Sequence, residues 1–223
     1  IVFMFAGFLK QSYPEYRIHL YKRLSEFAFD QGYDYWGWRF MGWGLHYMAD
    51  LSMPYHTTVL PGYSTPRMLW VNFLDVICIS GPADNALQLV SNKHMAIETY
   101  LLKVMEQYLR NNTASIIYDV LKADYDSPVY SDALPRSLLA KASNGMARKL
   151  DRAIIKYMPA DFVSNPDIEL GDRPDVENIV SIITEVHGQN ALTDIDLILA
   201  ESLKSFAMYG CSYIKSILED TQE

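Results

Sequence analysis

Residues 33–57, YDYWGWRFMGWGLHYMADLSMPYHT, form the stretch from which the fold of this chain is most directly inferred. Apolar and aromatic side chains recur in it with a helical period, and three glycines lie among them. Glycine lowers helix stability, so these glycines indicate that another helix or a ligand closely approaches the backbone. We therefore predict an aromatic helix over residues 33–51 and a loop, marked by prolines, over residues 52–66.

The same helical periodicity recurs along the rest of the chain, and the few strand-like runs are short and lie inside helical periods. We predict an all-α fold of about eight helices in one domain over residues 1–223, with the metal-site helices in 1–110 and a helical remainder of unassigned role in 111–223. Residues 69–79 are expected to be a buried helix that ends at Gly81-Pro82, and residues 159–174 a long loop. The other expected helices cover residues 17–29, 85–110, 114–122, 135–157, 176–187 and 193–218.

Composition narrows the class of protein. Of the 223 residues, 50% are hydrophobic and 21% are charged, which indicates a globular chain with a sizeable core and excludes a disordered one. The net charge of −8 gives no strong nucleic-acid signal, but it does not exclude an enzyme that meets phosphate through metal ions. No apolar stretch is long enough to span a bilayer. Cys78 and Cys211 form no CxxC motif, and the sequence leaves a disulfide between them open.

Histidine and carboxylate residues form two spaced clusters. His46, Asp50 and His56 make an H-x3-D-x5-H pattern, and His94 and Glu98 make H-x3-E. In each cluster a histidine and an acid lie four positions apart on an expected helix, so both side chains project from one face. His56 follows directly after the helix and can fold back toward that face. Imidazole nitrogen together with carboxylate oxygen suits zinc, and three protein ligands leave one position open for water or substrate.

A single such pair is more often a surface pair that stabilises its helix by a few tenths of a kcal/mol. The metal-site interpretation is preferred here for two reasons. Asp50 lies in an otherwise apolar helix, where an unpaired carboxylate is costly to bury, and the pattern occurs twice in one helical chain.

These motifs resemble those of the zinc-dependent phospholipase C and S1/P1 nuclease superfamily. The family carries H-x3-D-x5-H, followed some tens of residues later by H-x3-[DE], and here His94 comes 38 residues after His56. The surrounding Gly-x-x-Leu-His-Tyr and Asp-Leu-Ser-x-Pro-x-His strings strengthen the likeness. The resemblance is clear over residues 19–105 and rests most heavily on residues 21–57.

The resemblance implies an all-helical protein that holds up to three zinc ions, of which the residues of this chain support one or two. His56, His94 and Glu98 would hold one ion, His46 and Asp50 would contribute to a second, and Asp50 would bridge to a third. Asp50 and Glu98 are the carboxylates expected to take part in catalysis.

The implied activity is hydrolysis of phospholipid head-group phosphodiesters by metal-activated water, in a secreted or periplasmic protein with transient contact to a membrane surface. Two alternatives remain open. One is a single-strand nuclease of the same superfamily, and the other is a non-catalytic helical scaffold or partner-binding protein with a degenerate metal site.

One departure from the family pattern concerns the start of the chain. The family also uses an N-terminal Trp and a further His, Asp and His upstream of the first motif, and no such group precedes His46. The spacing of His19 does not match, so it is left out of the site. The apolar residues 1–9 are expected to belong to a core helix whose upstream part is missing, and a preceding N-terminal part is preferred over a contribution from a partner chain or a decayed site.

An aromatic run precedes the first motif. It could line a surface for acyl chains or stacked bases, but we expect it to lie mainly in the core. Its members are Tyr33, Tyr35, Trp36, Trp38, Phe40 and Trp43. G-x-S-x-G, Walker and G-x-G-x-x-G motifs are absent, so serine hydrolase, NTPase and Rossmann interpretations lack support.

Overall fold

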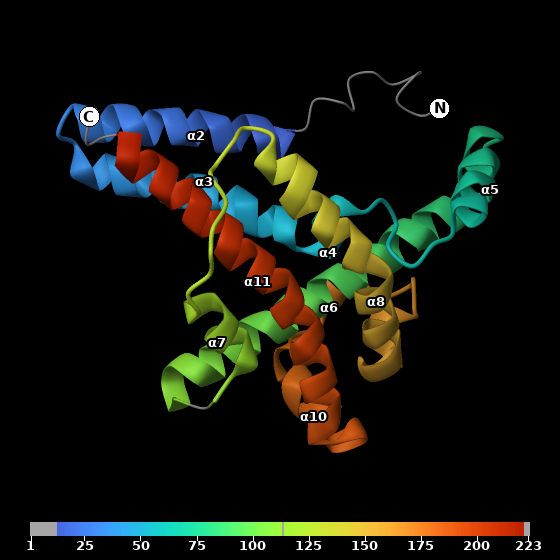
Figure 1. Ribbon diagram of the computed structural model, residues 1–223. Coiled ribbons are helices and arrows are strands. Elements are labelled where there is room, and N and C mark those ends of the chain that lie inside the picture. The colour runs from blue at the N-terminus through green and yellow to red at the C-terminus, as the bar shows by residue number, and fades with distance from the viewer. Residues whose placement is uncertain (1–12, 113, 221–223) are drawn as a thin grey trace. The chain divides into compact units, whose positions relative to one another are not determined.

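A computed structural model describes residues 13–112 and 114–220, and all regular structure in these residues is helical (Figure 1). The all-α prediction is confirmed, and the described residues contain eight α-helices of seven residues or more. The α-helices are α2 (Tyr13–Asp30), α3 (Asp34–Ser52), α4 (Pro54–Thr57), α5 (Thr65–Val76), α6 (Gly81–Asn111), α7 (Ile116–Lys122), α8 (Lys141–Tyr157), α9 (Ala160–Val163), α10 (Ile179–His187) and α11 (Gln189–Asp220). The π-helix η2 (Pro135–Ala140) and the 3-10 helices η3 (Leu170–Asp172) and η4 (Pro174–Asn178) complete the set.

The chain divides into two compact units. Within the described residues, unit 1 comprises residues 13–57, 121–144 and 202–220, and unit 2 comprises residues 58–112, 114–120 and 145–201. Helices α8 and α11 contribute residues to both units. The single domain over residues 1–223 stays a prediction.

Unit 1 is built on the α2–α3 hairpin, whose two helices run side by side (Figure 1). Ser25 of α2 donates a hydrogen bond to the carbonyl oxygen of Gly37 in α3 at 2.7 Å, and the Tyr213 ring of α11 packs against Gly44. The close approach predicted at the α3 glycines is therefore observed at two of them. Apolar residues from these helices and from η2 form the buried core, which consists of Ile18, Met41, Met48, Leu51, Leu134, Leu139, Tyr213 and Ile217.

Unit 2 is built around α6, which contacts α5, α9, α10, η3 and η4. The Tyr100 hydroxyl of α6 donates a 2.7 Å hydrogen bond to the Asp196 carboxylate of α11. Burial raises the pKa of the Tyr100 hydroxyl, which keeps the tyrosine protonated as the donor of the pair. Burial also raises the pKa of Asp196, while the hydrogen bond from Tyr100 opposes that shift. Lys103 of α6 forms an ion pair with Glu177 of η4, which fixes the far end of the same helix.

Several expected boundaries are wrong because prolines begin helices here. Pro66 and Pro82 are the second residues of α5 and α6, although the sequence prediction placed them in a loop and at a helix end. Pro54 likewise begins α4 inside the expected loop 52–66. Proline is tolerated at the first turn because that turn has no intrahelical acceptor for its N–H group. The expected loop 159–174 is also partly helical, since it contains α9 and η3.

Two expectations about burial are contradicted. Only Val71 of α5 is fully buried, while Leu69, Trp70 and Phe73 are more than half exposed, so residues 69–79 are not a buried helix. The aromatic run of α3 is also largely outside the core: five of its six members are at least 38% exposed, namely Tyr33, Tyr35, Trp36, Trp38 and Trp43. Helical periodicity in apolar residues does not by itself distinguish a side chain packed in the core from one left on an aromatic surface.

Among the described residues, no helix combines the length and apolar character required to cross a membrane. Cys78 and Cys211 carry free, exposed thiols. The helix expected at residues 1–9 lies outside the described residues.

Two glycine substitutions in α3 test how tightly this helix packs. Gly44→Ala is expected to lower the free energy of unfolding by about 1–3 kcal/mol, because the new methyl group would overlap the Tyr213 hydroxyl. Gly42→Ala meets no atom within 4 Å and is expected to raise it by about 1 kcal/mol through helix propensity. Urea unfolding measures both values, and equal effects would contradict the close contact between α3 and Tyr213.

Candidate metal centre

The orientation of α6 about its own axis is set by buried polar residues one and two positions before His94. Asn92 is buried, and its side-chain amide donates to the Ile168 carbonyl at 2.7 Å and accepts from the Leu170 N–H at 3.1 Å. These bonds attach the η3 region to α6 and satisfy backbone groups that would otherwise be buried without partners.

Lys93 lies next to Asn92 and is also buried. Its ammonium group donates a 2.8 Å hydrogen bond to the Asp151 carboxylate of α8, and both side chains are less than a tenth exposed. A buried charge needs a partner of opposite sign, because transfer from water to a low-dielectric interior is costly for either ion alone. Rotation of α6 would break this ion pair, so the pair fixes which face of the helix points outward.

His94 and Glu98 project from α6 outside the sector that is buried. Successive residues turn by about 100° in a helix, so the buried Asn92, Lys93 and Ala96 occupy a different sector from His94 and Glu98. His94 Nε2 lies 3.0 Å from Glu98 Oε1, and the two side chains are 27% and 48% exposed. The i,i+4 pair expected from the sequence is therefore formed, and it is accessible to solvent.

His56 is carried by the single turn of α4. The Pro54 and Tyr55 side chains of this turn are buried, and its Thr57 hydroxyl donates a 3.0 Å hydrogen bond to the hydroxyl of Ser143. Asn144 donates to the Thr57 carbonyl at 2.9 Å. These contacts hold the turn on both sides of His56, whose imidazole is exposed. His56 lies on a turn that begins at Pro54, and its fold-back toward the face of His46 and Asp50 stays a prediction.

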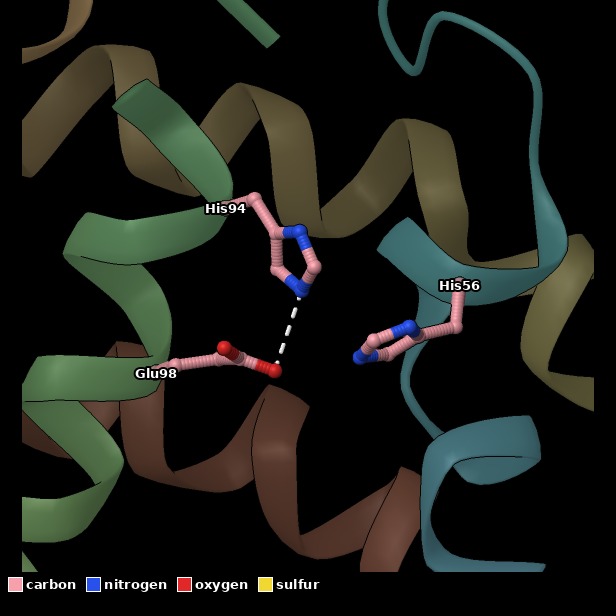
Figure 2. A group of neighbouring side chains, drawn as sticks. All are labelled: His56, His94 and Glu98. Carbon is pink, nitrogen blue, oxygen red and sulfur yellow. Dashed lines mark ion pairs between the residues drawn. The ribbon is translucent and has the colours of Figure 1, made fainter. Parts of the chain in front are cut away.

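His94 and Glu98 are two of the three ligands that the resemblance implies for one zinc ion, and Figure 2 draws the ion pair between them. His56, the third, belongs to unit 1 while the pair belongs to unit 2, so ligation of one ion by all three stays a prediction. Ligands of a tetrahedral zinc ion, at about 2.0–2.2 Å from the metal, lie about 3.3–3.6 Å from one another. The 3.0 Å between His94 Nε2 and Glu98 Oε1 is close to that spacing. Two imidazoles with one carboxylate are ligands that zinc commonly takes.

His46 and Asp50 form a pair of their own on α3 of unit 1. His46 Nε2 lies 3.7 Å from Asp50 Oδ2, with His46 69% exposed and Asp50 29% exposed. The Asp50 carboxylate therefore keeps access to water, and its need for a cation stays a prediction. Two of the five predicted ligands thus remain a pair, and the role of Asp50 as a bridging ligand stays a prediction.

Sequence reasoning did not find Lys93, Asp151 or Asn92, which fix the orientation of the His94–Glu98 pair. The sequence does not indicate that Lys93 is buried, because lysine side chains are mostly exposed to solvent. Its partner Asp151 lies 58 residues later. Only the packing of α6 against α8 shows that the two charges meet.

No family model, curated protein or solved structure gives a significant match to this chain. The resemblance to the phospholipase C and S1/P1 nuclease superfamily therefore stays a prediction that depends on the motif residues.

Zinc binding by the metal-free protein tests the group directly. At a zinc concentration 100 times the dissociation constant, binding is expected to raise the free energy of unfolding by about 2.7 kcal/mol. Glu98→Gln should weaken zinc binding by about 100-fold or more, since even the outer partners of metal ligands change affinity by about 10- to 100-fold. Urea unfolding with and without zinc measures the first effect and calorimetric titration measures the second, with His187→Gln as a control from a histidine on α10. Equal zinc affinity in Glu98→Gln and the parent protein would contradict the assignment.

Removal of one member of the buried ion pair should destabilise unit 2. Lys93→Met leaves the buried Asp151 carboxylate without its ammonium partner and is expected to cost about 3–5 kcal/mol in urea unfolding. The double variant Lys93→Met/Asp151→Leu removes both charges and should be more stable than the single variant. A single variant as stable as the parent protein would show that the pair does not fix α6.

Proposed function

We propose that this protein is a zinc-dependent phosphodiesterase that hydrolyses phospholipid head-group phosphodiesters. The observation that carries the proposal is the solvent-accessible pair on α6 of unit 2, in which His94 Nε2 lies 3.0 Å from Glu98 Oε1. His56 of unit 1 would be the third ligand of the same ion. A bound zinc ion would supply Lewis acidity and an activated water molecule at neutral pH.

The three side chains suit that task because of their charges. Two neutral imidazoles and one carboxylate compensate only one of the two positive charges of zinc, so the centre keeps an attraction for a phosphate anion. All three are at least partly exposed, which leaves a path for substrate.

A pocket of about 240 Å³ in unit 1 is lined in part by His56, and we propose that it receives the substrate. Leu51, Thr57 and Ala140 are among its lining residues, and Arg136 lies at the same pocket. The Arg136 guanidinium is 3.6 Å from the Glu15 carboxylate and is half exposed. A guanidinium at this position can hold a phosphate oxygen while the carboxylate fixes its orientation.

The substrate class is inferred from the aromatic surface of α2 and α3. Tyr21 contacts both Phe40 and Trp43, and Trp36 stacks on Phe40 with ring centroids 5.7 Å apart. Exposed Trp and Tyr side chains suit the boundary between lipid and water, where their rings meet apolar chains and their polar atoms stay solvated. This surface supports the proposal of a lipid substrate and of transient contact with a membrane surface.

The superfamily resemblance adds two roles to the proposal. His46 and Asp50 would hold a second zinc ion, and Asp50 and Glu98 would be the carboxylates that position the ions for catalysis. Secretion or a periplasmic location follows from the same resemblance.

Hydrolysis of bis-p-nitrophenyl phosphate with and without zinc tests the proposed activity. We expect activity that is lost on chelation and restored by zinc. His56→Gln should lower kcat/KM by at least about 100-fold, which corresponds to about 2.7 kcal/mol in the activation barrier. His187→Gln makes the same substitution at a histidine that is not a proposed ligand, and it should retain activity. Zinc-independent hydrolysis, or full activity in His56→Gln, would contradict the proposal.

A parallel assay on phosphatidylcholine and single-stranded DNA resolves the substrate class. Faster hydrolysis of the lipid, reduced by Trp36→Ala, supports the phospholipid assignment. Faster hydrolysis of the DNA would replace it with the nuclease alternative. The absence of turnover on either substrate in a protein that binds zinc would favour the non-catalytic alternative.

A further inference from the structure

Unit 2 contains a basic groove between α8 and the first part of α11. Its cavity has a volume of about 620 Å³ and is lined by four cationic side chains of α8: Arg148, Lys149, Arg152 and Lys156. Asp194 is the one acidic residue among those that line the cavity. Such a concentration of positive charge is unusual for a chain whose net charge is −8.

The two lysines already have partners. Lys149 forms a 2.7 Å ion pair with Glu201 of α11, and Lys156 donates a hydrogen bond to the Tyr157 hydroxyl, which in turn donates to Asp194. The hydrogen bond with Tyr157 raises the pKa of Lys156, so its ammonium group keeps its charge. Neither lysine is therefore the strongest available donor for a ligand.

Arg148 and Arg152 differ from the lysines. Among the residues that the structure describes, neither guanidinium has a hydrogen bond or an ion pair, and both are exposed at the groove. They lie four residues apart on one face of α8, where two like charges repel each other. An anion between them would remove this repulsion, and the planar fork of each guanidinium matches phosphate oxygens in a two-point contact.

Apolar residues also line the groove. They are Ala153, Leu197 and Ile198, and the buried Tyr157 lines it as well. A ligand that fills the cavity therefore meets both cationic groups and apolar atoms. This arrangement fits a phosphate group attached to an organic moiety better than it fits a bare inorganic ion.

We propose that this groove binds the phosphate group of a phosphate monoester, with Arg148 and Arg152 as the two principal donors. The site is distinct in its residues from the candidate metal centre, and the inference does not depend on the proposed hydrolase activity. The shared chemistry is the phosphate monoester, which is carried both by small soluble metabolites and by the lipid phosphatidic acid.

The test uses the whole protein in the presence of a chelator, so that phosphate cannot bind through a metal ion. Calorimetric titration with glycerol 3-phosphate at low ionic strength should show one site. Arg148→Gln/Arg152→Gln should weaken binding by about tenfold or more, because charge-assisted contacts to phosphate are lost. Arg110→Gln, an exposed arginine at the end of α6, removes one charge of the same kind and should leave the affinity unchanged.

Two further measurements keep the outcome decisive. The Arg148→Lys/Arg152→Lys variant keeps the charge but loses the guanidinium fork, and it should bind with intermediate affinity. Circular dichroism of all variants should show the parent helix content. Equal binding by the parent protein and the Gln double variant, or a response that sodium chloride reproduces at matched ionic strength, would overturn the proposal.

Vesicles distinguish the two sources of the phosphate. Co-sedimentation with phosphatidylcholine vesicles that contain phosphatidic acid, but not with those that contain phosphatidylserine, would identify a lipid monoester. Binding of glycerol 3-phosphate without co-sedimentation would identify a soluble one, and both results support the site. Tighter binding of single-stranded DNA than of glycerol 3-phosphate, lost in the Gln double variant, would overturn it in favour of a nucleic-acid surface.

Discussion

The buried ion pair between Lys93 and Asp151 constrains α6, and through α6 it constrains the candidate metal centre. Successive side chains of a helix are rotated by about 100° about its axis, so the direction of one side chain fixes the directions of its neighbours. Once Asn92 and Lys93 are held in the interior, His94 and Glu98 must project elsewhere. Any other orientation of α6 would break the pair and leave an unpaired charge in the interior, which is far less stable than a hydrogen-bonded one.

The helices themselves were largely predictable from the sequence, because apolar spacing reports the helical period wherever one face is covered. Their starts were not, as Pro66 and Pro82 show. Proline has two opposite meanings at a helix boundary, depending on whether the chain before it or after it is helical. Burial was also poorly predicted for α3 and α5. Trp36 and Trp70 fit the helical pattern whether they are buried or exposed, and only tertiary contacts decide which of these they are.

For the candidate site, the sequence determines the local geometry of each pair. Residues four apart on a helix face the same way in every fold, so the His94–Glu98 and His46–Asp50 pairs were predictable from spacing. Spacing gives no such information on His56, which lies 38 residues before His94 and on another helix. The basic groove on α8 falls between these cases. Its charges are visible in the sequence, but the cavity beside them depends on α11.

X-ray absorption at the zinc edge tests the central claim most directly, because it reports the atoms bound to the ion whether or not the protein is catalytic. With one equivalent of zinc, the first shell should consist of nitrogen and oxygen at about 2.0–2.2 Å, with the outer-shell scattering of two imidazole rings. His94→Gln should reduce that contribution to one ring. A shell of oxygen alone, or a spectrum that His94→Gln leaves unchanged, would contradict the account.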